Sequence, residues 1–503
     1  MDRVRLISVT STLAALCAMS VALSGCSQIV DFSQCESDSE CASGRVCDQG
    51  LCVAPQGCTE RASCVERLGD QAYCLAGACR TIDASRCGSL GQVFSSENAD
   101  GVIVPVGALM PLSGANQSKG VATRDGAELA LRQINSSGGL QGARLGLITC
   151  DTQYEPARAV ELANYLHDEL GVDAMVGAIS SAETLSLVDQ SVDDKGILLI
   201  SPASTTPGLS LRSDNFWRTI PSDALQAPAM GQLLRAREAE QVVVLYGGPD
   251  DPYGSGFFEA LNFYWGGLPA GQKPTVRAVS FDRAAPLAEV DRIGREIMGS
   301  GTPPDAIVLI GPSRAIDLLA ALEQGAVGSA ADTPIWVLPE ALRDQVLLQT
   351  EGAEGAFDRI IGTAPIREQT AIYFTFDSFY QSSFGLDPSS TQFADKAYDA
   401  AFLIGAALGA QPDPLQTTGS DLSQTLELIV PAKAASASYQ AIGRDFTQIA
   451  GALSEGTKIA ITGVSSELNF DANHDPADVT IGAWSIKGSP PMFFDEPLPE
   501  PAQ

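Results

Sequence analysis

Positive charge is scarce in this sequence. Only 18% of the 503 residues are charged, and 31 Lys and Arg against 61 Asp and Glu give a formal net charge of -30. Such a surplus of negative charge argues strongly against nucleic acid or an anionic membrane surface as a partner, because both repel acidic proteins. The 45% of hydrophobic residues predicts a folded chain with a large core and two or three domains.

Motifs that carry catalysis are missing as well. There are only two histidines, His167 in an amphipathic helical segment and His474 in a predicted hairpin turn, and neither has a nucleophile signature nearby. The acidic spacing within 471–478 is reminiscent of a calcium loop but has neither the glycine nor the closing glutamate, so a plain turn is preferred. We therefore predict that the protein is not an enzyme and holds no metal or cofactor.

Long apolar runs are absent except near the N-terminus. The run at 6–23 follows two arginines and closes with Leu23-Ser24-Gly25-Cys26, which resembles a bacterial lipobox. That resemblance implies a signal peptide at 1–25 and a lipidated Cys26, so that lipid alone would attach the protein to a membrane. Ser27 is not the aspartate that favours inner-membrane retention, which points to the outer membrane of a Gram-negative cell. An uncleaved transmembrane anchor is the alternative.

Cysteine is concentrated in the segment 35–87, where aliphatic residues are few. Nine cysteines in 53 residues leave no room for an ordinary core. Eight of them form two groups with similar spacing, which predicts two tandem disulfide knots after a short linker at 26–34: Cys35, Cys41, Cys47 and Cys52, then Cys58, Cys64, Cys74 and Cys79. Disulfides are preferred to zinc because the protein is exported and no histidine lies nearby, whereas the connectivity stays open.

Two further cysteines remain once Cys26 is lipidated and Cys17 is removed with the predicted signal peptide. Cys87 and Cys150 are the natural remaining pair, and a bond between them would join the knot segment to the folded body. A buried free thiol at Cys150 is the alternative.

The body, from residue 102 onward, alternates apolar strands with amphipathic helices over short connections. Three such units in succession predict a parallel, doubly wound sheet. In the unit at 174–209, one strand ends at Ser180-Ser181 and the next strand ends at the hydroxyl-rich loop 203–206. Because parallel strands end at the same edge of a sheet, the two loops should lie side by side and offer hydroxyl and N–H donors to a carboxylate.

A second series of strands and helices begins after 217–221, and the chain then returns to the first series with a strand at 359–363. We predict an α/β fold of two doubly wound lobes with parallel central sheets, joined by a multi-strand hinge and separated by a ligand cleft. The predicted segments are 102–221 and 363–463 for lobe 1, 222–362 and 464–488 for lobe 2, and 489–503 for a Pro-rich tail.

Several motifs follow one another in a recognisable order between 102 and 487. They are Val106-Gly107-Ala108-Leu109-Met110-Pro111-Leu112-Ser113-Gly114, Asp125-Gly126-Ala127-Glu128-Leu129-Ala130, Ser201-Pro202-Ala203-Ser204-Thr205, Pro339-Glu340 and Asn469-Phe470-Asp471. Their order resembles the branched-chain amino acid binding proteins of the type I periplasmic binding family. The resemblance implies that an amino acid-like small molecule binds between the lobes, for transport by an inner-membrane ABC-type permease or for sensing.

The resemblance also implies roles for individual residues. Ser181 and the loop Ala203, Ser204 and Thr205 would hold the carboxylate of the ligand, Tyr253 would close over it, and Glu340 would receive its ammonium group, because a buried cation requires a partner charge.

Two positions depart from the family pattern. Lys119 stands where family members often have an aromatic residue over the side-chain pocket, and Pro312-Ser313 replaces another aromatic. A more polar or acidic ligand, or one that is not an amino acid, is therefore an alternative.

A second function stays open beside the receptor. The protein would then be an outer-membrane lipoprotein that uses the same fold as an envelope scaffold, with its knots or its lobes docked onto another envelope protein. The lipid anchor favours this scaffold, whereas the Ser181, Thr205 and Glu340 set favours the receptor.

Overall fold

The computed structural model describes most of the chain after residue 56. The described residues are 35, 46–48, 51–53, 57–88, 90, 102–140, 142–210, 213–299, 303–330, 333–367, 369–388 and 391–500. The predicted signal peptide, the lipidation site Cys26, the linker 26–34 and Cys41 lie outside them. None of the helices within these ranges has the length and apolar character needed to cross a membrane.

The chain divides into two compact units, 1–56 and 57–503. In the first unit, β1 (Val46–Asp48) pairs antiparallel with β2 (Leu51–Val53). A Cys35–Cys47 disulfide holds this hairpin, and Cys52 is also disulfide-bonded. The first of the predicted knots is therefore a small disulfide-bonded hairpin.

The second knot opens the larger unit. It consists of α1 (Arg61–Leu68) and a hairpin of β3 (Ala72–Leu75) and β4 (Ala78–Thr81), and two disulfides, Cys58–Cys74 and Cys64–Cys79, hold it together. The predicted disulfide-rich segment before the binding fold is confirmed.

This knot packs tightly against the body that follows it. The Tyr73 hydroxyl donates a 2.6 Å hydrogen bond to the carbonyl of Leu170, and the Tyr165 hydroxyl accepts one from the backbone N–H of Asp83 at 2.8 Å. A disulfide joins Cys87 to Cys150, 63 residues further on. The knot is thus part of the first lobe, fixed to it by a covalent bond and a buried interface.

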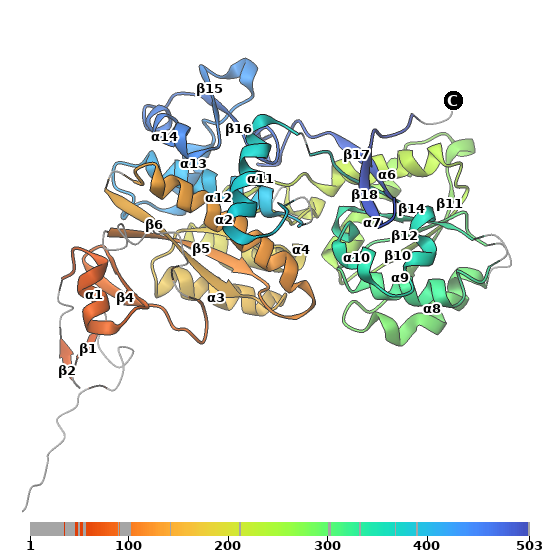
Figure 1. Ribbon diagram of the computed structural model, residues 1–503, viewed down its shortest axis with the longest axis horizontal. Coiled ribbons are helices and arrows are strands. Elements are labelled where there is room, and N and C mark those ends of the chain that lie inside the picture. Colours follow the sequence, from red (N-terminus) through yellow and green to blue (C-terminus); the bar gives the residue numbers. More distant parts are fainter. Residues whose placement is uncertain are drawn as a thin grey trace, which may run out of the picture. The chain divides into compact units, whose positions relative to one another are not determined.

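Lobe 1 contains a five-stranded parallel sheet (Figure 1). Its strands, in sheet order, are β6 (Ala143–Asp151), β5 (Val102–Met110), β7 (Ala174–Gly177), β8 (Leu198–Ser201) and β9 (Phe216–Arg218). Its other elements are α2 (Gln117–Ser136), α3 (Pro156–Asp168), α4 (Ser181–Leu187), α5 (Asp193–Lys195), α11 (Ala371–Phe384), α12 (Ala394–Gly409), α13 (Gly419–Leu426), α14 (Phe446–Ser454), β15 (Ala437–Gln440) and β16 (Ile459–Thr462).

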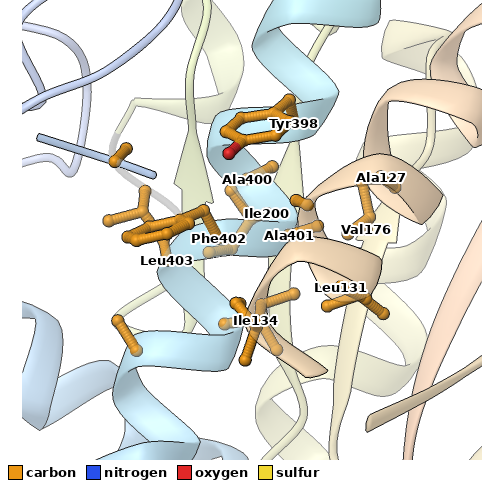
Figure 2. Close-up of a cluster of buried hydrophobic side chains, with 14 of the residues drawn as sticks. Ala127, Leu131, Ile134, Val176, Ile200, Tyr398, Ala400, Ala401, Phe402 and Leu403 are labelled. Atoms are coloured by element: carbon orange, nitrogen blue, oxygen red, sulfur yellow. The ribbon is translucent and has the colours of Figure 1, made fainter. Parts of the chain in front are cut away.

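The main core of lobe 1 lies between this sheet and the helix pair α2 and α12. Helix α12 is almost entirely buried, because α2, α13 and α14 surround it, and it carries no charged residue after Asp399. Figure 2 shows Leu131 and Ile134 of α2 beside Ala401 of α12, with Val176 and Ile200 from the strands behind them. The two helices approach closely at Gly126, where a Cβ atom would lie 2.0 Å from the carbonyl oxygen of Ala394. Glycine is therefore required at this position.

Lobe 2 contains a seven-stranded sheet. Its strands, in sheet order, are β11 (Thr275–Ser280), β10 (Gln241–Tyr246), β12 (Ala306–Leu309), β13 (Ile335–Leu338), β14 (Ile360–Pro365), β17 (Ile481–Lys487) and β18 (Met492–Glu496). Helices α6 (Asp223–Ala236) and α7 (Pro252–Gly266) share a core with one face, and α8 (Val290–Met298), α9 (Ala315–Gln324) and α10 (Gln345–Gln349) share a core with the other. The predicted two-sheet α/β architecture is confirmed.

Lobe 2 departs from the sequence prediction in two respects. The strand expected at 359–363 to return to lobe 1 is β14, which pairs with β13 in the second sheet and is buried there. The expected Pro-rich tail contains β18, which pairs antiparallel with β17 and places Phe493 edge-on against Trp484. Prolines at 490, 491 and 497 flank this strand and hide its pattern in the sequence.

The chain crosses between the lobes three times, after β9, after β14 and after β16. The first and third crossings are held together by a buried ion pair, in which Arg218 Nε lies 2.6 Å from Asp475 Oδ1. Beside it, His474 stacks on Trp217 with ring centroids 3.9 Å apart. The acidic turn that resembled a calcium loop lies at this crossing, and within it Asp471 accepts hydrogen bonds from the backbone of Asn473 and Asp475.

Candidate functional site

A cavity lies between loops of the two lobes. Its volume is about 50 Å³, several times the roughly 10–15 Å³ that one water molecule requires. Six of the seven predicted ligand residues line it: Lys119, Ser181, Ala203, Thr205, Tyr253 and Glu340. The structure therefore brings predicted residues of both lobes, from Lys119 to Glu340, around one cavity.

Ser204 is the exception. Its side chain is fully buried, and its hydroxyl lies 2.7 Å from Thr184 Oγ1 and 3.2 Å from the carbonyl oxygen of Ala178. Neighbouring residues of an extended loop point to opposite sides, so Ser204 braces the loop from behind while Ala203 and Thr205 face the cavity.

The two hydroxyl-rich loops of lobe 1 are tied to each other. Ser181 Oγ accepts a 3.3 Å hydrogen bond from the backbone N–H of Thr206, and Ser180 caps α4 by accepting from the N–H of Glu183. Ser201 beneath them accepts from the N–H of Ser204 at 3.0 Å. These contacts have the adjacency that a parallel sheet predicts. Within the described ranges, no hydrogen bond engages the N–H groups of Ser181 and Thr205.

Asp223, which the sequence prediction missed, lies behind Thr205. The Thr205 hydroxyl donates a 2.7 Å hydrogen bond to Asp223 Oδ2, and Asp223 is completely buried at the start of α6. Burial raises the pKa of Asp223 to about 7. Its position directly after the first crossing is the signal that could have identified it.

Glu340 supplies the carboxylate of lobe 2. It begins the short 3₁₀ turn Glu340–Leu342 directly after β13, and its side chain is 14% exposed. The nearest cation is Lys396, whose Nζ lies 3.6 Å from Glu340 Oε1. Among the described residues, the Glu340 carboxylate makes no hydrogen bond, so its oxygens remain available to a donor in the cavity.

Lys119 spans the gap from lobe 1 to lobe 2. Its ammonium donates a 2.8 Å hydrogen bond to the carbonyl of Ala341 and lies 3.5 Å from Asp344 Oδ2. Burial lowers the pKa of Lys119, and Asp344 opposes that shift. A position that the resemblance assigns to an aromatic wall thus holds a buried cation that connects the two lobes.

Tyr154 and Arg283 also line the cavity and were not predicted. Tyr154 follows β6 with a positive φ of 65°, and burial raises its pKa. Arg283, from lobe 2, lies 2.9 Å from Asp251 Oδ1. Tyr154 stands at the same sheet edge as the hydroxyl loops, so strand order could have revealed it. Arg283 follows no such pattern.

Comparison with known proteins gives a consistent assignment. The periplasmic binding protein family matches residues 103–447. The chain is 30% identical over 153 residues to a leucine-, isoleucine-, valine-, threonine- and alanine-binding protein of Pseudomonas aeruginosa, which is 30% of this chain and 40% of that protein. It is 28% identical over 182 residues to the Leu/Ile/Val-binding protein of Escherichia coli, which is 34% of this chain and 48% of that one. The chain thus spans about half the length of these curated relatives.

Solved structures share the fold at low sequence identity. A leucine-binding protein from Thermotoga maritima has a TM-score of 0.62 at 18% identity, covering 79% of this chain and 99% of that chain. An isoleucine complex of a branched-chain amino acid transporter substrate binding protein from Streptococcus pneumoniae has a TM-score of 0.59 at 20% identity, covering 78% and 100%. A benzoate complex of a solute binding protein from R. palustris has a TM-score of 0.57 at 19% identity, covering 80% and 97%.

Proposed function

The chain belongs to the periplasmic binding protein family, and on this premise we propose that it is a non-enzymatic, extracytoplasmic receptor for a small solute. The solute is an amino acid or a related carboxylate, captured between the lobes for ABC-type transport or for sensing. Proteins similar to this chain bind branched-chain amino acids or benzoate, which supports both ligand classes.

One observation supports this function most directly. On lobe 1, the N–H groups of Ser181 and Thr205 make no hydrogen bond within the described ranges. On lobe 2, the Glu340 carboxylate makes no hydrogen bond there either and has the Lys396 ammonium 3.6 Å away. All three residues line the same cavity. The two N–H groups suit a carboxylate on the ligand, and the Glu340 carboxylate suits an ammonium group. Each charge-assisted hydrogen bond would contribute about 1.5–3 kcal/mol to the binding free energy. A zwitterionic ligand would therefore bind both lobes at once and favour the closed form over an open one.

A thermal-unfolding screen tests this function. The oxidised full chain is heated with a panel of amino acids and small carboxylates. A true ligand at 100 times its dissociation constant should raise the free energy of unfolding by about 2.7 kcal/mol, because it binds only the folded state. The absence of a shift across the whole panel would contradict the receptor.

The envelope scaffold is the second candidate, and the docked knot favours it. The knot lies before the family match, yet it is fixed to lobe 1 through Cys87–Cys150. In this candidate, Cys26 carries the lipid and an outer-membrane site holds the protein beside an envelope partner. Mass spectrometry of the N-terminal peptide tests the lipid, and cross-linking in intact cells to a protein other than a permease would support the scaffold.

A further inference from the structure

A second, larger chamber adjoins the ligand cavity. Its volume is about 410 Å³, against about 50 Å³ for the first. Residues of all three interlobe crossings line it, including Pro221, Arg367 and Ser465. Glu340 and Phe393 line both chambers and form the wall between them. A ligand whose head contacts Glu340 therefore has this hinge chamber directly beside it.

The hinge chamber contains an ammonium group without hydrogen bonds. The side chain of Lys396 is 11% exposed, and its Nζ lies 3.6 Å from Glu340 Oε1 and 3.7 Å from Asp395 Oδ1. Within the described part of the chain, this ammonium donates no hydrogen bond. A buried ammonium has three donors to satisfy, so Lys396 has capacity for an acceptor on a ligand.

The residues around Lys396 leave one further donor in the same chamber, the Tyr373 hydroxyl. Arg367 donates through Nε to Asp395 at 2.9 Å and through Nη1 to the Tyr373 hydroxyl at 3.2 Å, which leaves that hydroxyl proton free for another acceptor. Although burial opposes it, the charges of Arg367 and Lys396 lower the pKa of Asp395 to about 2. Asp395 thus stays ionised and is already paired with its neighbours, and Asp495, which also lines the chamber, pairs with Arg343 at 2.6 Å. Lys396 and the Tyr373 hydroxyl keep donors for an acceptor on a ligand.

The cations of the smaller cavity are less available. Lys119 already donates to Ala341 and pairs with Asp344, and Arg283 pairs with the buried Asp251. A second anionic group on the ligand would have to displace one of these hydrogen-bonded partners there. Lys396 has its carboxylate neighbours only at 3.6 and 3.7 Å and keeps its hydrogen-bond donors for such a group.

We propose that the ligand is an amino acid with a second carboxylate on an extended side chain, and that Lys396 in the hinge chamber recognises this second carboxylate. This inference rests on the receptor function and adds the ligand class: dicarboxylic amino acids or γ-linked acidic dipeptides. The head binds at Ser181, Thr205 and Glu340, and the side chain passes Phe393 into the hinge chamber.

Calorimetry with matched ligands tests the proposal. The full chain is titrated with 2-aminoadipate and with norleucine, which have the same side-chain length but differ in the terminal carboxylate, and with γ-glutamylglycine. The dicarboxylate should bind about tenfold more tightly than norleucine or better, as one charge-assisted bond provides. Equal or tighter binding of norleucine overturns the inference and leaves the receptor function standing. Failure of every amino acid and carboxylate to bind overturns both.

Variants then locate the preference. Lys396→Met should reduce the ratio of the two affinities to near one, and Lys396→Arg should retain it. Because the two ligands are compared on the same variant, a general loss of stability cancels. Lys433→Met, at an exposed lysine in the turn Ala432–Ala434, is the matched control and should leave the ratio unchanged. A preference that survives Lys396→Met overturns the assignment of this residue, whatever the wild-type ratio.

Discussion

The two lobes present opposite chemistry to the cavity they share. Lobe 1 offers hydroxyl and N–H groups at Ser181 and Thr205, while its one charged lining residue among those described, Lys119, is already bound to Ala341 and Asp344 of lobe 2. The nearby acid Glu183 of lobe 1 is completely buried. Lobe 2 offers the ionisable groups Glu340 and Arg283. The hydroxyl and N–H dipoles of lobe 1 are therefore suited to an anionic group, and the Glu340 carboxylate of lobe 2 is suited to a cationic one.

The lobes also differ in how they are held together. All disulfides found among the described residues precede residue 151, and one of them, Cys87–Cys150, ties the second knot to lobe 1. Lobe 2 is held by packing around Trp336 and Trp484 and by ion pairs such as Arg359–Glu323. The lobe that carries the knot is therefore covalently constrained, and the other lobe is not.

Removing the covalent constraint should have the largest effect. Cys87→Ala with Cys150→Ala opens a loop of 63 residues, which should cost about 4 kcal/mol by the chain-entropy estimate. Hydrogen exchange should show the loss mainly in β5, β6 and α3 of lobe 1. Equal loss of protection in β10 and β12 would contradict the division between the lobes. Cys58→Ala with Cys74→Ala, within the knot, is the control.

The buried acid of lobe 1 should make stability depend on pH. Burial raises the pKa of Glu183 to about 7, so the folded protein retains a proton that the unfolded chain releases above about pH 4.5. The stabilising contribution is present below pH 4.5 and is lost as pH rises through 7, with a full span of about 3 kcal/mol. Glu183→Gln should flatten this part of the curve of unfolding free energy against pH. The exposed Glu161→Gln is the control, and an unchanged slope in Glu183→Gln would contradict the assignment.

The acid of lobe 2 should act on the ligand instead. Glu340→Gln should weaken an amino acid by about 3 kcal/mol, because the ammonium group loses its buried counter-charge. A carboxylate without an ammonium group should bind as before. Both affinities are measured by calorimetry, with the exposed Glu351→Gln as the matched control. Equal weakening of both ligands would assign Glu340 a structural role.

A single hydroxyl of lobe 1 should have the smallest effect. Ser181→Ala removes one donor to the carboxylate and the contact with Thr206, and should weaken amino acids and plain carboxylates alike by about 1.5 kcal/mol. Ser186→Ala on the same helix is the control. A loss confined to amino acids would reverse the roles assigned to the two lobes.

Local patterns predicted the lobe 1 half of the site. Strand, hydroxyl loop and helix follow one another within a few residues, so Ser181 and Thr205 could be placed at one sheet edge without any structure. The same periodicity predicted most helices and strands of both sheets. Three strands were missed, β9, β17 and the proline-flanked β18, and the elements between 411 and 458, including α13 and α14, could not be placed.

Long-range pairings were beyond the sequence. Lys119 forms an ion pair with Asp344, 225 residues later in the chain, and Arg218 forms one with Asp475, 257 residues later. No spacing rule connects such partners, because only the folded topology brings them together. The buried roles of Asp223 and Lys396 were missed for the same reason, since a charged side chain in a single sequence is expected at the surface.

The close packing of α2 against α12 affects the position of a residue in the hinge chamber. Gly126 allows the first turn of α12 to settle where it does, and that turn carries Lys396 to the edge of the hinge chamber. The absence of a side chain at Gly126 therefore helps to determine where the ammonium group of Lys396 lies. Changes in ligand preference can for this reason arise from substitutions inside the lobe, at residues that no solute ever touches.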